Sequence, residues 1–254
     1  MPSSRRQFIR TTISASAALS LSAYLNAMSL TTGINKKIVC VGGHPDDPES
    51  GCGGTLAKFI KAGYEVTIIY LTSGEAGIEG KTHTEAASIR TKEAIAACKV
   101  LGAKPVFAGQ IDGDTIISNE WFNKLRTLIE AEQPAIVFTH WPIDAHKDHQ
   151  AASILTIQSW MHGHAFELYF YEVCTGAQTM SFKPTDYIDI TATQELKRKA
   201  VYEHVSQNPE SIYQASDCNH AAMEQRRGKE INVAYAEAFV RMEESVKEGL
   251  SIWK

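Results

Sequence analysis

Short apolar runs alternate with amphipathic stretches along most of the chain. The runs predict strands, because a few consecutive apolar residues bounded by turn residues are typical of buried strands. The predicted strands are Lys37–Gly42, Val66–Leu71, Val106–Ala108, Ala135–Thr139, Glu167–Val173 and Tyr187–Ile190. Their regular alternation with helices indicates a parallel sheet that is covered on both faces.

Between these runs, apolar residues recur with helical spacing. Leu56, Phe59 and Ile60 share one helical face, and Gly63 follows where that helix should end. The predicted helices are Thr55–Ala62, Thr84–Leu101, Trp121–Glu132, Asp148–Met161, Gln194–His204 and Ala221–Glu244. Residues 206–219 are expected to form the longest loop, a candidate rim or lid. The predicted fold class is α/β, a Rossmann-like sheet sandwich with helices on both faces.

The first thirty residues have a different pattern. Arg5 and Arg6 lie in a segment that matches the twin-arginine export signal, and an uncharged stretch rich in Ala, Ser and Leu follows. This stretch is too polar to span a bilayer stably, although an anchoring helix is the alternative. We expect residues 1–30 to be a cleaved signal and residues 36–254 to be one domain. The mature protein is expected to be periplasmic or extracytoplasmic, without a stable membrane span.

Composition narrows the class of protein further. Among the 254 residues, 44% are hydrophobic and 21% are charged, which argues against wholesale disorder, a collagen-like chain and a coiled coil. Removing the three arginines of the signal takes the formal charge from −4 to −7, so no nucleic acid partner is expected. The five cysteines include no CxxC pair, and we expect them to be buried packing residues.

An acid-rich turn, Gly-His-Pro-Asp-Asp-Pro-Glu at residues 43–49, follows the first predicted strand. The adjacent carboxylates of Asp46 and Asp47 repel each other beside His44, and a divalent cation would relieve that repulsion. The alternative is a turn whose acids cap the next helix. In α/β folds, chemistry concentrates beyond the carboxyl ends of strands, which is where this turn lies.

A second polar segment, residues 144–149, reads Asp-Ala-His-Lys-Asp-His after the strand that ends at Thr139. The alternative is a polar loop with Asp148 near a helix N-terminus. Together the two segments supply the parts of a catalytic zinc site, which has three nitrogen or oxygen ligands and one open position. A carboxylate that is not a ligand can act as general base, and a further histidine can act as proton donor.

These segments resemble a known family. Residues 44–49 resemble the HPDD signature of the PIG-L (LmbE-like) N-acetylglucosaminyl deacetylases, and residues 146–149 resemble their HxDH motif. Pro48 stands where the HPDDE form has an acid, and Glu49 follows as in the HPDDxE branch, which looks closest to the bacillithiol-biosynthesis-like deacetylases. The resemblance runs from Lys37 to Arg241. It also includes Thr72–Gly77, Arg90, Glu93, Leu101–Gly102, Ile111–Gly113, Tyr187–Thr191, Lys197, Ala200, His204, Ser206 and Gln207.

The resemblance implies a zinc-dependent hydrolase that removes an N-acetyl group from an N-acetylglucosamine-type substrate. By motif position, it implies that His44, Asp47 and His149 hold Zn²⁺. It also implies that Asp46 is the general base on zinc-bound water. His146 would stabilise the oxyanion and protonate the leaving amine. The same donor types also accept iron, cobalt or manganese, so Fe²⁺ is the alternative metal in the cell. Homo-oligomers are common in the family.

Further residues have two interpretations each. Arg90 and Asp112 look like substrate contacts by resemblance. The alternatives are a helical salt bridge between Arg90 and Glu93 and a turn acid before Gly113. Trp141 either stacks on a sugar ring or packs in the core. The roles of His140 and His204 stay open.

Three other functions use parts of the same pattern or the same fold class. A metal-dependent amidase acting on another amide, such as a thiol or sugar conjugate, would use the same chemistry. A non-catalytic zinc or glycan-binding protein would need neither Asp46 nor His146. A nicotinamide-dependent oxidoreductase is excluded, because the place of the GxGxxG fingerprint reads GGHPDDPESG and its acids would repel a pyrophosphate.

Overall fold

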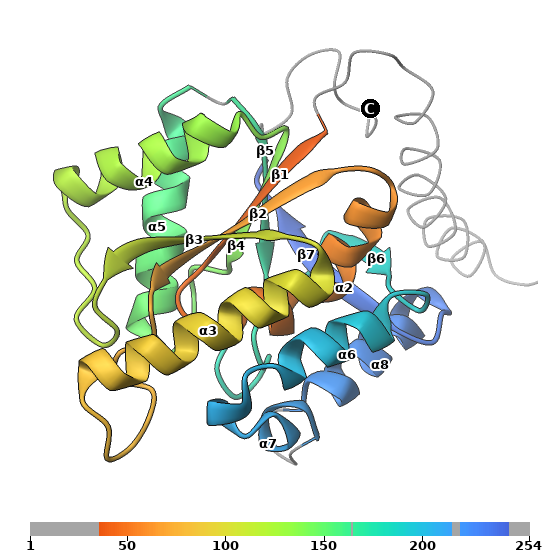
Figure 1. The fold of residues 1–254 in the computed structure, drawn as a ribbon. Coiled ribbons are helices and arrows are strands. Elements are labelled where there is room, and N and C mark those ends of the chain that lie inside the picture. Colours follow the sequence, from red (N-terminus) through yellow and green to blue (C-terminus); the bar gives the residue numbers. More distant parts are fainter. Residues whose placement is uncertain (1–35, 164, 215–218, 244–254) are drawn as a thin grey trace, which may run out of the picture.

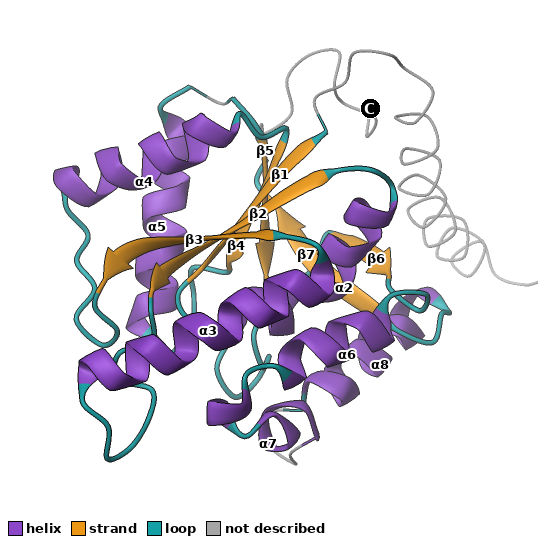
Figure 2. Ribbon diagram, in the orientation of Figure 1, coloured by secondary structure: helices purple, strands orange, loops and turns teal. Residues whose placement is uncertain are grey.

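A twisted sheet forms the centre of the computed structural model, which describes residues 36–163, 165–214 and 219–243 (Figures 1 and 2). The predicted signal at residues 1–30 lies outside the described residues. The seven strands have the order β3-β2-β1-β4-β5-β7-β6. They are β1 (Lys37–Gly42), β2 (Glu65–Thr72), β3 (Lys104–Gln110), β4 (Ile136–His140), β5 (Glu167–Tyr171), β6 (Asp186–Asp189) and β7 (Ala236–Arg241).

Helices cover both faces of this sheet, which confirms the predicted α/β class (Figure 2). They are α2 (Asp47–Lys61), α3 (His83–Leu101), α4 (Asn119–Glu132), α5 (Lys147–Met161), α6 (Gln194–Tyr202), the 3₁₀ helix η1 (Val205–Gln207), α7 (Pro209–Gln214) and α8 (His220–Ile231). Side chains of β1 alternate between two cores, because successive residues of a strand point to opposite faces. Ile38 and Cys40 pack with α2 and α3, whereas Val39 and Val41 pack with α4 and α5.

The C-terminal part of the sheet departs from the prediction. Strands β3, β2, β1, β4 and β5 are parallel, but β7 runs antiparallel to both β5 and β6. The helix predicted over Ala221–Glu244 was therefore wrong in its second half. It ends at Ile231, where Asn232 adopts a left-handed conformation with φ 63°. The chain then forms β7 between β5 and β6, where hydrogen bonds to both neighbouring strands outweigh the helical preference of the local sequence.

Two further boundaries differ from the prediction. The loop predicted at residues 206–219 contains most of η1 and all of α7. Helix α2 begins at Asp47, well before the predicted Thr55, and passes a non-helical residue at Cys52 (φ −145°). Proline near the start of α2, together with the acids of its first turn, favours this early beginning. The acid-rich turn thus continues directly into a helix.

The cysteines and helices also bear on the expectations about compartment. Cys40, Cys52 and Cys98 are free and buried, as predicted. Cys174 is disulfide-bonded, so the expectation that every cysteine only packs was wrong there. Cys218 lies outside the described residues. Within the described ranges, no helix is both long and apolar enough to cross a membrane.

Candidate active site

The two polar segments meet at the carboxyl ends of β1 and β4, which are neighbours in the sheet. From β1 the chain first builds outward to β2 and β3, and it then returns to add β4 on the other side of β1. The connections that leave β1 and β4 therefore run to opposite sides of this pair of strands. Such a switch point is where open α/β sheets bind ligands.

The turn after β1 is held in a strained shape. The backbone N–H of His44 donates to Asp47 Oδ2 at 2.7 Å, which closes the turn. Between them Asp46 has φ 102°, a backbone conformation that residues with a side chain rarely adopt. Such strain persists only where the surrounding structure enforces it, and it is concentrated at functional sites.

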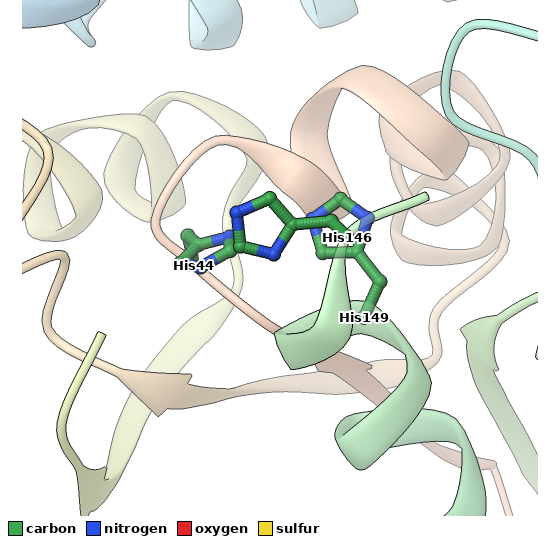
Figure 3. A group of neighbouring side chains, drawn as sticks. All are labelled: His44, His146 and His149. Atoms are coloured by element: carbon green, nitrogen blue, oxygen red, sulfur yellow. The ribbon is translucent and has the colours of Figure 1, made fainter. Parts of the chain in front are cut away.

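One carboxylate oxygen brings the predicted ligands together. Asp47 Oδ2 lies 3.1 Å from His44 Nδ1 and 3.1 Å from His149 Nε2. Figure 3 shows the imidazoles of His44, His146 and His149 gathered in one place, the first from the turn after β1 and the others from the start of α5. The structure thus places donors from two distant segments around one point.

Among the described residues, three groups place candidate ligand atoms within 4.8 Å of one another: His44, His146 and His149; Asp47, His140 and His149; His44, Asp112 and Asp148. Hydrogen bonds distinguish between these candidates. His140 Nε2 accepts from the Gly43 N–H at 3.0 Å, so its lone pair is already used. His44 Nε2 faces Asp148 Oδ2 at 3.1 Å and Asp112 Oδ1 at 3.2 Å, which leaves Nδ1 for a metal.

The remaining atoms fit a metal site of two imidazoles and one carboxylate, which is a donor set that zinc enzymes use. His149 Nδ1 lies 3.2 Å from Asp144 Oδ1, on the side of the ring away from Asp47. His44 has the equivalent partner in Asp148. Carboxylates in these positions fix the tautomer and orientation of ligating histidines. Each histidine ring therefore has one nitrogen directed toward Asp47 that can bind a metal once its proton has left.

Buried charge at this point also favours a cation. Burial raises the pKa of Asp47, but His149 and His140 outweigh it and hold this pKa well below its usual value. Burial lowers the pKa of His149, but the charge of Asp47 outweighs it and raises this pKa to about 9. Positive charge is thus strongly favoured between these groups. A divalent ion supplies that charge when protons leave the histidines.

Asp46 and His146 flank the predicted ligands. Burial raises the pKa of Asp46 to about 6, although Arg90 opposes the rise from 3.2 Å away. His146 is half-buried, with its ring centroid 4.6 Å from that of His44. Its Nδ1 accepts from the Asp148 N–H at 3.3 Å, so Nε2 carries the proton of the neutral ring. One residue is placed to accept a proton and the other to donate one.

The predicted substrate contacts are buried residues that lie beside Asp46 and His44. Arg90 is 3% exposed and Asp112 is 8% exposed. Arg90 donates to the Pro45 carbonyl at 2.6 Å and pairs with Asp46, rather than with Glu93. Asp112 accepts from the Ala76 N–H at 3.2 Å while facing His44. Apart from the buried Nε of Arg90, these groups face protein partners, and contact with a sugar stays a prediction.

Asp144, Asp148 and His140 are parts of the site that sequence reasoning did not assign. The concentration of titratable residues at positions 144–149 was the available signal for the two acids, whereas His140 had only its place beside that segment. Asp148 was considered only for the helix dipole, yet it also accepts from Thr115 Oγ1 at 2.7 Å. Trp141 packs edge-on against Phe170 and donates to the Met180 carbonyl, which supports the packing interpretation.

Comparisons with known proteins identify the family of the chain. A family model described as PIG-L, GlcNAc-PI de-N-acetylase, matches residues 39–160. The diacetylchitobiose deacetylase of Thermococcus kodakarensis is 32% identical over 70% of this chain and 73% of its own. The chain belongs to the PIG-L family. Membership identifies it as an enzyme of the deacetylase class, which hydrolyses an amide C–N bond.

Two other relatives show the range of proteins that this PIG-L chain resembles. The N,N'-diacetylchitobiose deacetylase of Pyrococcus horikoshii, solved with its inhibitor MPG, superposes with a TM-score of 0.73 at 27% identity. The match covers 88% of this chain and 92% of that one. The 4-oxalmesaconate hydratase of Pseudomonas putida is 24% identical over 65% of this chain and 72% of its own. Related folds can carry different reactions, so the detailed chemistry depends on the side chains of the site.

Proposed function

We propose that this chain is a zinc-dependent hydrolase that removes the N-acetyl group from an N-acetylglucosamine-type amino sugar. The observation that carries the proposal is the convergence of His44 Nδ1 and His149 Nε2 on Asp47 Oδ2, each at 3.1 Å. Asp46 and His146 flank this point, the first placed to accept a proton and the second to donate one. The names of the Thermococcus and Pyrococcus relatives support the substrate class.

His44, Asp47 and His149 would hold the metal. Bound zinc supplies a Lewis acid that polarises an acetamide carbonyl and lowers the pKa of water. Iron, cobalt or manganese could occupy the same donors, because histidine and carboxylate ligands select weakly among these ions. Asp144 and Asp148 hold the far nitrogens of the two histidines, so the chain itself fixes the direction of the ligand lone pairs.

Asp46 acts as the general base and accepts a proton from the attacking water. Its pKa of about 6 lies close to neutral pH, where a base is most effective. Arg90 holds the carboxylate at 3.2 Å and the preceding carbonyl at 2.6 Å, which keeps the strained turn in place. We propose that this orienting contact is the main role of Arg90, with Asp112 acting similarly on His44.

His146 supplies a proton to the amide group that is hydrolysed. Its Nε2–H donates first to the oxygen that gains negative charge and then to the nitrogen of the departing amine. Water adds to the carbonyl carbon and the C–N bond breaks, giving acetate and a free amino group. Asp46 then releases the proton that it took from water, and His146 regains one, both by exchange with solvent, so each residue returns to its starting state.

We also propose that the enzyme acts outside the cytoplasm. The twin-arginine pattern at the N-terminus motivates this, and the disulfide at Cys174 supports it because disulfides persist in oxidising compartments. An amino-sugar glycan or a fragment of one is the substrate that such a location favours. Fusion of residues 1–30 to a reporter would test export, with the Arg5→Lys, Arg6→Lys pair as the matched control.

Acetate release tests the function directly. Metal-loaded protein would be assayed on N-acetylglucosamine, N,N'-diacetylchitobiose and N-acetylated non-sugar amides, and we expect turnover of the sugars. Asp46→Asn should retain the metal but lose turnover by about 10²- to 10⁴-fold, because general base catalysis is removed. The exposed Asp114→Asn variant is the control for charge removal.

Each other outcome has a clear meaning. Turnover of the non-sugar amides alone would favour the amidase alternative. Metal binding without any turnover would favour a binding protein. Fully active Asp46→Asn would contradict the assignment of the base.

A further inference from the structure

The short segment between α6 and α7 is bound tightly to α3 by one serine. The Ser206 N–H donates to Glu93 Oε1 at 2.7 Å, and its hydroxyl donates to Glu93 Oε2 at 2.6 Å. Both oxygens of one carboxylate are therefore occupied by one residue. Charge-assisted bonds of this kind are among the stronger hydrogen bonds in proteins. Helices α3 and α6 lie side by side, which brings this segment to the middle of α3 (Figure 1).

The next residue extends the connection to the loop after β2. Gln207 Nε2 donates to the Gly77 carbonyl at 3.0 Å and to Ser206 Oγ at 3.0 Å. One residue before Val205, His204 is fully buried, with Nε2 3.5 Å from Glu49 Oε1 in the first turn of α2. We call residues 204–207 the brace, because they touch α2, α3 and the loop after β2.

Two contacts of the brace, those with Glu93 and Gly77, lie near Arg90. Glu93 lies three residues after Arg90 on α3, on the same side of the helix. Gly77 lies so close to the guanidinium that a Cβ there would collide with Arg90 Nη1, and Gly74 is similarly close on another side. The Arg90 side chain is thus enclosed by a loop to which Gln207 is bonded, and Glu93, on the same helix as Arg90, anchors Ser206.

Arg90 also holds the conformation of the loop segment that carries Asp46. It donates to the Pro45 carbonyl at 2.6 Å and holds Asp46 Oδ2 at 3.2 Å. The φ of 102° at Asp46 needs such external contacts, because the isolated backbone disfavours it. A continuous set of contacts therefore runs from Ser206 and Gln207 through Arg90 to the proposed general base.

We infer that the brace is a positioning element for Asp46, and that Ser206 and Gln207 set the rate of the reaction without touching substrate or metal. This inference rests on the proposed function, because it presupposes catalysis by Asp46. The two predicted histidine ligands are held by different residues, His149 by Asp144 and His44 by Asp148. Loss of the brace should therefore lower kcat while KM and zinc content stay constant.

Ser206→Ala is the central test. We expect kcat to fall by about 10- to 100-fold, because small misplacements of a catalytic group have effects of this size. Ser206→Thr, which keeps the hydroxyl, should restore most of the rate, and Gln207→Ala should act in the same direction as Ser206→Ala. Ser118→Ala is the matched control, because Ser118 caps α4 at 3.3 Å from Trp121 N, and its loss should lower Tm without changing kcat.

A double-mutant cycle separates positioning from general loosening of the fold. Glu93→Ala and Ser206→Ala should each lower kcat, and the double variant should be no worse than either one. In an Asp46→Asn background, Ser206→Ala should change the residual rate very little. Additive losses, or an undiminished effect of Ser206→Ala in that background, would overturn the inference.

The inference and the proposed function fail in different ways. Wild-type protein without turnover on any acetylated substrate would overturn the proposed function, and this inference with it. Active wild-type protein with unchanged kcat in Ser206→Ala would overturn the inference alone. A loss of zinc from Ser206→Ala, measured by metal analysis of the purified variant, would overturn it too, because the brace would then act on the ligands.

Discussion

At the scale of single residues, Asp144 joins three neighbours at the edge of the candidate metal centre. Its Oδ1 accepts from the His146 N–H at 2.9 Å and lies 3.2 Å from His149 Nδ1. Its Oδ2 accepts from the Thr179 hydroxyl at 2.9 Å. Through these bonds Asp144 holds a proton of His149 on Nδ1, so Nε2, opposite Asp47, is the nitrogen available to a metal.

Asp144→Asn should therefore weaken metal binding although Asp144 binds no metal. Loss of an outer carboxylate typically lowers zinc affinity by about 10- to 100-fold, because the ligand histidine becomes less basic and less well oriented. Competition against a chromophoric chelator at fixed pH would measure this. The exposed Asp114→Asn variant should bind as the wild type does, and wild-type affinity in Asp144→Asn would refute the role.

The residue types of the site could be predicted from the sequence because they are concentrated in two short segments. The partners of each residue could not, because the sheet brings them together across long stretches of chain. His44 Nε2 meets Asp148 Oδ2 across 104 positions, and Asp144 meets Thr179 across 35. Arg90 was considered with Glu93, its neighbour on the helix, whereas α3 directs it to Asp46.

At the scale of elements, helix α2 lies very close to the sheet and to the loop after β6. A Cβ added at Gly51 would collide with the ring of Tyr171, whose hydroxyl donates to the Val41 carbonyl at 3.1 Å. A Cβ added at Gly54 would lie 2.8 Å from Ile190 Cδ1. The glycines after the acid-rich turn thus permit close packing that fixes the start of the helix.

Gly51→Ala should lower the free energy of unfolding by about 1–3 kcal/mol, because overpacking a full core forces its neighbours to move. For a chain of this size that corresponds to about 2–4 °C in Tm per kcal/mol. Thermal denaturation would measure the change. Gly163→Ala is the control, since a Cβ there meets nothing within 4 Å. Equal Tm values for the two variants would contradict the packing argument.

Elements with a clear local pattern were predicted closely, and those decided by distant partners were not. Strand β1 was predicted with its exact bounds, because its apolar run is buried on both faces. Strand β7 was taken for the end of a helix, since residues 236–241 read Ala-Glu-Ala-Phe-Val-Arg and their extended form depends on β5 and β6. The buried Glu237 of this strand makes contacts that only the folded chain reveals.

At the scale of the whole molecule, one buried lysine joins the C-terminal elements to the helix that begins at the active-site turn. Lys197 Nζ lies 2.7 Å from Glu224 on α8 and 2.7 Å from Glu237 on β7. Glu237 also accepts from the backbone N–H groups of Gly54 and Thr55, at 3.0 Å and 2.7 Å. These bonds tie α2, α6, α8 and β7 into one unit that supports the turn at residues 43–49.

Lys197→Met tests this arrangement, because methionine keeps the apolar stem and removes the charge. The lysine side chain is fully buried, and although burial lowers its pKa, Glu224 and Glu237 raise it, so the ammonium stays protonated. Its removal leaves two buried carboxylates without a cation, which should lower the free energy of unfolding by about 3–5 kcal/mol in urea denaturation. Exposed Lys199→Met should change it by less than about 0.5 kcal/mol. If the two variants unfold at the same urea concentration, the buried charges do not hold these elements together, and the active-site turn must depend on the apolar cores alone.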